Sequence, residues 1–471
     1  MSDEGEPMGM FNSVKSLAYH QNGEDDPYIT LKEVCSPPSH TFFHKQPSSL
    51  KSFEQDDDEE EKEELQVLAT DNLLLVAKTE DEVAQLEVYV YEDEADNFYV
   101  HHDIMLPAIP LCVEWLDVPV HQAGPNKPIP PLLDKDSRGS FCAIGTMDPD
   151  IEIWDLDVVD CMFPNAILGA GGAEITTDAP KKKKKKKEKK KSKKANDTHH
   201  VDSVLALAAN RAHRNLLASA SADKTVKLWD LNTTTCAKSY SHHTDKVCAL
   251  AWHPRETSVL LSGSYDRTVV AADMRAPEAK APKWGVESDV EGIQWDPHDP
   301  NYFYISTESG MVHLHDTRNA PSKPAATAPV WTLQAHDRAC SAMDVNPVIP
   351  GFIATGGFDK QVKLWNIAPG GGGPSLVINR NLDLGRVFSV GFGPDKAVGF
   401  RLAVAGSNGV VQVWDTSTNA AVRRVFAGRV PEVPEGKEER MIRVQDDNEE
   451  SDDDEGEEGG NERDGWESMD E

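Results

Sequence analysis

The chain has 471 residues and a formal net charge of −32, because 80 acidic residues outnumber 48 lysines and arginines. Such a length allows one large domain or roughly two to three ordinary ones. The seven cysteines are scattered and form no CxxC pair, which argues against a disulfide framework and a cysteine zinc site and favours a reducing compartment. The start MSDEGEPMGM has no secretory pattern and no apolar run reaches about eighteen residues, so we expect neither export nor a membrane span.

The acidic charge lies toward the two ends of the chain. Residues 54–64 hold nine acidic side chains and residues 446–471 hold fifteen, whereas 199–430 carries 23 basic and 21 acidic residues. Blocks of like charge repel themselves and stay disordered. We therefore expect a mostly disordered acidic segment at 1–64 and a disordered acidic tail at 431–471. Within the tail, Ser451 precedes Asp-Asp-Asp-Glu and is a candidate phosphosite for an acid-directed kinase; an unmodified serine is the equal alternative.

Seven related units follow one another between these ends. Each is an apolar run, a tight polar turn such as Asp-Lys or Asn-Gly, and an alternating run that ends at Trp-Asp or a relic of it, which predicts a β-hairpin. In chain order the units are NLLLVAKTEDEVAQLEVYVYE (72–92), FCAIGTMDPDIEIWD (141–155), NLLASASADKTVKLWD (215–230), VLLSGSYDRTVVAAD (259–273), YFYISTESGMVHLHD (302–316), FIATGGFDKQVKLWN (352–366) and RLAVAGSNGVVQVWD (401–415).

The spacing of the units indicates the fold. The last five end markers are 43, 43, 50 and 49 residues apart, and the full set is Tyr91, Trp154, Trp229, Ala272, His315, Trp365 and Trp414. This resembles the WD-repeat family, in which a period of about 40–45 residues forms one four-stranded propeller blade. We predict an all-β, seven-bladed WD-repeat β-propeller over 65–430, with a disordered Lys-rich insert at 169–199 between its second and third blades.

A second pattern recurs in three of the units. A His lies 29 residues before the end marker, a Ser or Thr lies ten before it, and an Asp lies six before it. In the WD-repeat family these positions form one hydrogen-bonded Asp–His–Ser/Thr–Trp network, which satisfies a buried indole and a buried imidazole. A catalytic Ser–His–Asp site is the alternative, and the threefold repetition argues against it. The residues assigned to this structural network are His200, Ser219, Asp223, Trp229, His243, Ser262, Asp266, His336, Thr355, Asp359 and Trp365.

The first unit begins with what reads as a second strand. The innermost strand of that blade has to come from upstream, where LQVLAT (65–70) and FNSVKSLAY (11–19) are the two candidates. Neither resembles LCVEW (111–115), VCALAW (247–252) or GIQW (292–295), which we assign as inner strands of other blades. The sequence therefore does not show how the first blade is closed.

The most basic stretch of the chain lies in its middle. With the outer strand of blade two at 157–168, residues 169–199 form a long connection on the face that carries the Asp turns. If 420–428 is the last outer strand, the acidic tail leaves from that same face. The tract could be a nuclear localisation signal for an import receptor, a sequence-blind RNA contact or a solvated loop. Its lysines are Lys181, Lys182, Lys183, Lys184, Lys185, Lys186, Lys187, Lys189, Lys190, Lys191, Lys193 and Lys194.

Other candidate sites are weak. His313 and His315 would face one side of a strand, but His315 occupies the end-marker position, which favours a structural role over a metal pair. The segment PGGGGP (369–374) lacks the Gly-Lys-Ser/Thr of a phosphate loop, and Trp284 and Trp466 are expected to be exposed without a site. No residues combine a nucleophile, a base and oxyanion donors, so we expect no enzyme, no cofactor, no metal and no small-molecule substrate.

Several segments occur together in a characteristic order. They are DDPYITLKE (25–33), YVHHDIMLP (99–107), VEWLD (113–117), IEIWDLDVVD (151–160), the lysine tract and LASASADKTVKLWD (217–230). Over most of 25–430 the chain resembles the periodic tryptophan protein 1 family of nucleolar WD-repeat proteins. Members usually carry a longer N-terminus with a Trp-containing strand, which this chain lacks, so it could be a shortened form.

The resemblance implies a function. It implies a non-enzymatic factor in the nucleus and nucleolus that assembles the large ribosomal subunit and supports rRNA processing, with pre-ribosomal proteins and rRNA as partners. Some family members are linked to chromatin at ribosomal RNA genes, so a histone-binding module is the main rival. An adaptor of another machine, such as a ubiquitin ligase, is a further one.

Overall fold

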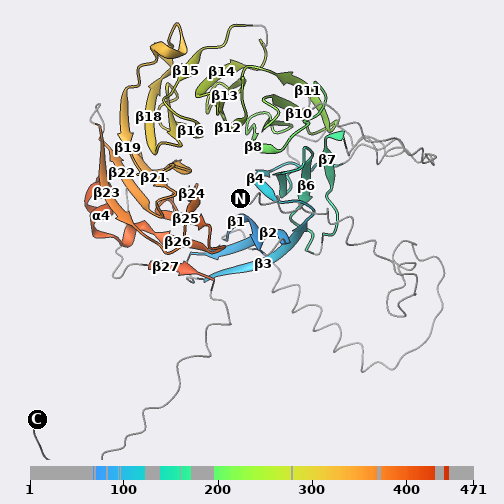
Figure 1. Cartoon of the computed structure of the whole chain (residues 1–471). Coiled ribbons are helices and arrows are strands. Elements are labelled where there is room, and N and C mark those ends of the chain that lie inside the picture. Colours follow the sequence, from blue (N-terminus) through green and yellow to red (C-terminus); the bar gives the residue numbers. More distant parts are fainter. Residues whose placement is uncertain are drawn as a thin grey trace, which may run out of the picture.

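The computed structural model describes residues 67, 71–80, 83–93, 95, 97–121, 138–159, 161–170, 196–276, 279–368, 373–429 and 440–444. These residues form seven antiparallel sheets arranged as a ring around a central axis (Figure 1). Within each sheet, strands that follow one another in the chain lie side by side. The predicted all-β, seven-bladed propeller is therefore confirmed. No helix in the described part of the chain is long and apolar enough to cross a membrane.

The sheets are numbered here as blades one to seven. Blade one is β1 (Asn72–Glu80), β2 (Val83–Glu92) and β3 (Asn97–Leu106). Blades two to four are β4 (Pro110–Leu116), β5 (Phe141–Thr146), β6 (Ile151–Asp155) and β7 (Ala166–Leu168); β8 (Val204–Ala209), β9 (Leu216–Ser221), β10 (Val226–Asp230) and β11 (Thr235–Tyr240); β12 (Val247–Trp252), β13 (Val259–Ser264), β14 (Thr268–Asp273) and β15 (Lys283–Gly285).

Blades five to seven have the same order of strands. They are β16 (Val290–Trp295), β17 (Tyr302–Thr307), β18 (Met311–Asp316) and β19 (Trp331–Gln334); β20 (Ala342–Val345), β21 (Phe352–Gly356), β22 (Val362–Ile367) and β23 (Pro374–Arg380); β24 (Val387–Phe392), β25 (Arg401–Gly406), β26 (Val411–Asp415) and β27 (Arg440–Arg443). The helical elements are short: η1 (Thr317–Asn319), η2 (Pro324–Ala326), η3 (Thr416–Thr418), α4 (Ala420–Phe426) and η4 (Ala427–Arg429).

The turn between the second and third strands of a blade requires a left-handed backbone. Lys224, Arg267 and Lys360, each directly after the turn Asp, have φ values of 72°, 61° and 66°. Gly310 and Gly409 occupy the corresponding place with φ values of 80° and 75°. Glycine adopts this conformation without a steric penalty, whereas the polar residues depend on the hydrogen bonds around the turn. The Asp-Lys, Asp-Arg and Asn-Gly pairs in the sequence therefore mark these turns correctly.

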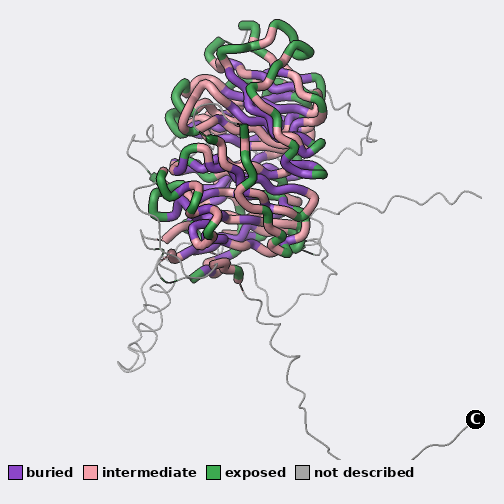
Figure 2. Tube along the Cα trace, turned by 90° about the vertical axis from the view of Figure 1, so that its left-hand side faces the viewer, coloured by how far each residue is buried: buried purple, intermediate pink, exposed green. Residues whose placement is uncertain are grey.

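The core lies between the blades rather than at the ring axis. The second strands of blades two to six are the most enclosed, and all six residues of β5 are buried. Each Trp end marker packs against the preceding blade, so that Trp154 joins a cluster with Leu86 and Ile104 of blade one. Figure 2 shows buried residues through the body of the ring and exposed ones at the turns and connections. Because every blade covers its neighbour, stability depends on a complete circle of contacts.

One predicted strand is wrong. Residues 420–428 do not form the outer strand of blade seven, because α4 covers 420–426. Asn419 caps this helix by accepting the Ala421 N–H at 2.9 Å, and Val422 and Phe426, four residues apart, form its buried side. The spacing of four is the helical period, which the short apolar run concealed. Phe426 stacks on Phe352 with ring centroids 4.2 Å apart.

The outer strand of blade seven is β27 instead. It pairs with β26, with Arg443 opposite Gln412. This strand lies inside 431–471, which we expected to be disordered throughout, so that expectation is corrected for 440–443. Because Arg443 ends beside the turn that precedes β26, the chain still leaves blade seven on the face of the Asp turns. The remaining domain boundaries stay predictions, and residues 1–66 and 445–471 lie outside the described residues.

Candidate functional site

The first His network joins four side chains of blade three. His200 places Nδ1 2.9 Å from Asp223 Oδ2 and Nε2 2.7 Å from Ser219 Oγ. The indole N–H of Trp229 donates to the same Ser219 oxygen at 2.8 Å. Because that oxygen accepts from Trp229, the serine hydroxyl proton is free to point at His200 Nε2, and His200 Nδ1–H donates to the carboxylate. Every buried polar group in the chain of contacts has a partner.

Burial sets the charge state of this network. It lowers the pKa of His200, despite the opposing effect of Asp223, so the ring is neutral at pH 7. Burial also acts to raise the pKa of Asp223, but hydrogen bonds from His200 and Thr225 outweigh it and bring that pKa to about 2. His200 and Ser219 are both fully buried, so a substrate cannot reach the imidazole or the hydroxyl. The arrangement is therefore structural.

The same geometry recurs in blades four and six. His243 lies 3.2 Å from Asp266 and 2.8 Å from Ser262 Oγ. The end marker there is Ala272, so no indole donates to that serine. In blade six, His336 contacts Asp359 at 2.9 Å and Thr355 Oγ1 at 2.9 Å, and Trp365 donates to the same hydroxyl at 2.9 Å. The structure thus brings together all eleven residues of the predicted network.

In other blades the end-marker side chain has a different hydrogen-bond partner, which the sequence pattern did not predict. In blade two the indole N–H of Trp154 donates to Glu152 at 3.2 Å. In blade one the hydroxyl of Tyr89 donates to Glu87 at 2.5 Å. The strand irregularity that precedes Trp229 also precedes Tyr89. The end marker of blade one is therefore Tyr89 rather than Tyr91, and a Glu two residues earlier was the available signal.

Two further expectations concern single side chains. Trp284 is 2% exposed, so the expectation that it is exposed was wrong; it packs edge-on against Phe303 of the next blade at 5.0 Å between ring centroids. The rings of His313 and His315 are 6.1 Å apart on one side of β18, as the strand period requires. His313 pairs with Glu287 at 2.9 Å, and burial lowers the pKa of His315 to about 4. Among the described residues, no group of three or more metal-binding side chains exists.

The lysine tract lies outside the described residues, but the residues next to it are placed. Ala170 donates its backbone N–H to Asp150 at 2.9 Å, beside the turn of blade two. On the other side, the Asn196 carbonyl accepts from Lys227 in blade three. Both points of attachment are on the face of the Asp turns. The twelve lysines thus remain a predicted contact for a receptor or RNA, and Ser451 is likewise outside the described residues.

The same face carries acidic side chains around β16. Burial, together with the charges of Glu308 and Asp289, raises the pKa of Glu291 to about 7. Arg267 forms an ion pair with Asp289 at 3.3 Å, and Glu287 contacts His313. This surface is defined here as the acidic rim of blade five: Glu287, Asp289, Glu291 and Glu308. Its charge is complementary to a basic partner.

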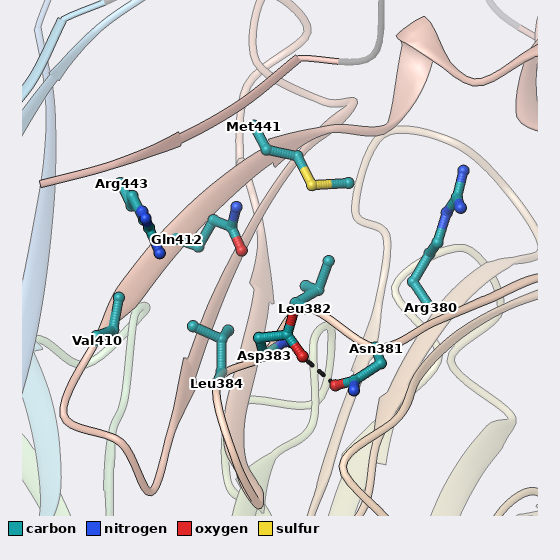
Figure 3. Close-up of a pocket in the computed structure, with 9 residues that line it drawn as sticks. All are labelled: Arg380, Asn381, Leu382, Asp383, Leu384, Val410, Gln412, Met441 and Arg443. Carbon is teal, nitrogen blue, oxygen red and sulfur yellow. Dashed lines mark hydrogen bonds between the residues drawn. The ribbon is translucent and has the colours of Figure 1, made fainter. Parts of the chain in front are cut away.

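A groove of about 310 Å³ lies on this face where blades six and seven meet (Figure 3). Leu382, Leu384, Val410 and Met441 supply apolar surface, while polar groups surround it. Its lining contains no Ser, Cys or His side chain. The lining residues are Arg380, Asn381, Leu382, Asp383, Leu384, Val410, Gln412, Met441 and Arg443.

Seven sheets in a ring with a repeated Asp–His–Ser/Thr–Trp network define a WD-repeat β-propeller, a class of scaffold that is generally non-catalytic. The family model described as WD domain, G-beta repeat, matches residues 192–230, 234–271 and 327–366. An uncharacterized WD repeat-containing protein of Schizosaccharomyces pombe is 47% identical over 93% of this chain and 75% of its own.

Two further relatives carry the name of one WD-repeat family. Periodic tryptophan protein 1 of Saccharomyces cerevisiae is 37% identical over 94% of this chain and 77% of its own length. The periodic tryptophan protein 1 homolog of Drosophila melanogaster is 30% identical over 76% of this chain and 70% of its own. The chain belongs to the periodic tryptophan protein 1 family.

Proposed function

We propose that this protein is a non-enzymatic scaffold that assembles the large ribosomal subunit in the nucleolus and supports rRNA processing. The observation that carries the proposal is the match to periodic tryptophan protein 1 over 94% of the chain, together with the role that this resemblance implies. The groove of blades six and seven combines apolar and polar side chains and has no Ser, Cys or His in its lining, which fits a binding role. A rigid ring with loops on two faces offers several protein-binding surfaces at once.

The proposal divides the work between the ring and the charged segments. The acidic rim of blade five suits a ribosomal protein, because such proteins are basic and opposite charge steers association. The twelve lysines of 181–194 serve nuclear import and neutralise rRNA phosphates without reading sequence. The lysine insert is attached to the same face of the ring on which β27 ends. We therefore expect RNA and basic proteins to bind the scaffold on that face.

Sedimentation of a tagged chain tests this function. We expect the protein to migrate through a sucrose gradient with large-subunit precursors, and to shift to lighter fractions after RNase treatment. Depletion should cause precursors of the large-subunit rRNA to accumulate, measured by hybridisation with probes to the spacers. Recovery with nucleosomes alone, or migration that ignores RNase with normal rRNA processing, would overturn the proposal and favour a chromatin module.

A variant separates import from RNA binding. Replacing the twelve lysines by glutamine in a chain that carries an unrelated nuclear localisation signal should restore nuclear entry. If the tract also binds RNA, the rescued protein will leave the precursor fractions at lower salt than the wild type. A matched control replaces the exposed lysines Lys224, Lys280 and Lys323 of the ring, which we expect to leave the salt dependence unchanged.

A further inference from the structure

Blade seven departs from the regular blades at the positions of the His network. Counted back from Trp414 by the spacing of blades three, four and six, these positions are Gly385, Val404 and Asn408. Gly385 has a φ of 73°, and a Cβ on it would lie 2.4 Å from Asn408 Oδ1, so a larger residue would be strained there. Leu384, directly before Gly385, lines the groove of blades six and seven. The groove therefore lies beside the place where the His network is missing.

In regular blades a lysine fills the corresponding space. Lys363 of blade six, two residues before the end marker, donates to the Ala335 carbonyl at 2.7 Å. Lys227 holds the same position in blade three, is 0% exposed and also donates to a carbonyl of the preceding connection. In blade four the lysine is on the outer strand, where Lys283 reaches the His242 carbonyl at 3.5 Å. An amino group with its aliphatic chain thus occupies this space in three blades.

Blade seven has no lysine at this place. Gln412 holds the position two residues before the end marker, and its buried Oε1 has no hydrogen-bond partner. Arg443 is opposite Gln412 on β27, as Lys283 is opposite Val270 in blade four, but it is exposed and forms no ion pair with another described residue. A buried acceptor without a donor is unfavourable and rare in folded proteins. The space that a lysine fills elsewhere is therefore open here, with an acceptor in its wall that still needs a donor.

The connection that borders the groove is held in place. Asp383 has a φ of 58°, and its N–H donates to Asn381 Oδ1 at 3.1 Å. The side chain of Asn408 donates to the Asp383 carbonyl at 2.9 Å, and its backbone N–H donates to the Leu384 carbonyl at 3.2 Å. Leu384 is buried in a core cluster that spans blades six and seven. Because the groove is formed in advance, a ligand does not have to order this connection.

The lining has an apolar middle and cationic ends. In Figure 3, Leu382 and Met441 lie between Arg443 on one side and Arg380 on the other. Asp383 is the one acidic residue of the lining, so two arginines and one aspartate leave a net charge of +1. The lining contains no aromatic side chain on which a nucleic-acid base could stack. Charge and apolar surface together therefore favour an acidic peptide over RNA.

We propose that the groove of blades six and seven binds an extended segment of a partner protein in which an aliphatic residue lies between acidic residues. The aliphatic side chain occupies the space that the lysine chain fills in blade six. A carboxylate of the segment pairs with Arg443, and one of its backbone N–H groups donates to Gln412 Oε1. A volume of about 310 Å³ suits one or two side chains rather than a folded element. This partner differs from the basic proteins assigned to the acidic rim of blade five and does not depend on the ribosomal role.

Selection from a random library of short peptides displayed on phage tests the proposal. The library is first depleted on an immobilised peptide of residues 181–194, because that lysine tract attracts acidic peptides by charge alone. Selection on the full-length chain should then enrich an aliphatic residue with Asp or Glu on both sides. The synthetic consensus peptide, labelled with fluorescein, gives a Kd by fluorescence anisotropy at physiological salt.

Two variants of the groove and one matched control assign the binding. Arg443→Glu replaces a cation by an anion and should weaken binding at least about tenfold. Gln412→Met keeps a side chain of similar length but removes the acceptor, and should weaken binding about three- to tenfold. Arg424→Glu is the control, because Arg424 is exposed on α4 of the same blade and does not line the groove. The control should keep the wild-type Kd.

Photo-crosslinking keeps the test decisive if a variant is destabilised. A consensus peptide with a photoreactive leucine should crosslink, in the wild-type chain, to the segments that carry Leu382 or Met441. Selection without a consensus, a consensus without acids, or a Kd that both groove variants leave unchanged would overturn the proposal. So would competition by a poly-uridine oligonucleotide, or binding that appears only after deletion of 446–471, which would assign the groove to RNA or to this chain's own tail. These outcomes are separate from sedimentation with large-subunit precursors, which tests the ribosomal role.

Discussion

Ser219 and Ser262 occupy the same place in blades three and four but make different numbers of hydrogen bonds. Ser219 accepts from Trp229 and bonds His200, whereas Ser262 bonds His243 alone because Ala272 replaces the indole. Ser219→Ala therefore leaves two buried polar groups without partners, and Ser262→Ala leaves one. A buried polar group without a hydrogen-bond partner lowers the free energy of unfolding by about 1–3 kcal/mol. We expect Ser219→Ala to lower the free energy of unfolding by about 4 kcal/mol and Ser262→Ala by about 2 kcal/mol.

Urea denaturation measures this difference. Tryptophan fluorescence and circular dichroism should give coincident transitions, and the midpoints can be compared if the slopes are equal. The exposed Ser322→Ala serves as the control, with a change within about 0.5 kcal/mol. Thr355→Val keeps the shape of the side chain but leaves His336 and Trp365 without their hydrogen-bond partner, so its loss of stability should resemble that of Ser219→Ala. Equal losses for the two serine variants would refute the reasoning that satisfied partners determine the cost.

Three further predictions concern acid stability, the junction of the ring and the acidic tail. The pKa of Asp223 is about 2 against an ordinary 3.8. Its ionised form therefore adds about 2 kcal/mol to the free energy of unfolding above pH 3.8, and this contribution is lost as the pH falls toward 2. In the Asp223→Asn variant the urea midpoint should depend less on pH over that range. His200 adds a loss below pH 6.5, because its lowered pKa keeps it neutral only in the folded state. Arg401 contacts Asp93 and Asp415 at 2.6 Å each, so Arg401→Met should cost about 3–5 kcal/mol in the same assay by leaving buried Asp415 uncompensated, whereas exposed Arg275→Met should cost little. Deleting 446–471 should tighten non-specific RNA binding at low salt if the tail competes for the lysine tract, and filter-binding curves that do not change would contradict that competition.

The sequence predicts what the repeat dictates. His200, Asp223 and Ser219 could be named because an identical spacing recurs, and recurrence reports a shared geometry rather than a local propensity. The same logic located the turns, since a positive φ at Lys224 follows the turn Asp in each copy. Where a unit departs from the repeat, this information disappears. In blade two the Glu152 carboxylate alone accepts from Trp154, and it lies two residues before the end marker rather than at the spacing that recurs in blades three, four and six.

Features outside the repeats were harder to predict. The run 420–428 is short and apolar, and its helix is decided by the Asn419 cap and by the buried pair Val422 and Phe426. Trp284 lies in a three-residue strand, and its burial depends on Phe303 of the next blade, a contact between blades that no local pattern encodes. These errors share a cause, because each depends on packing between elements that a single hairpin pattern does not describe.

The junction between blades one and seven departs from the regular ring. The blades there lack the His network, and blade one has three strands among the described residues. In compensation, Arg401 reaches across to Tyr91 and Asp93, and Arg440 of β27 donates to the Asp93 carbonyl at 3.0 Å. These contacts join residues more than 300 positions apart in the chain. Such distant pairs form only when the ring closes, because no local element brings them together. These charged contacts therefore join the first and last blades of the ring.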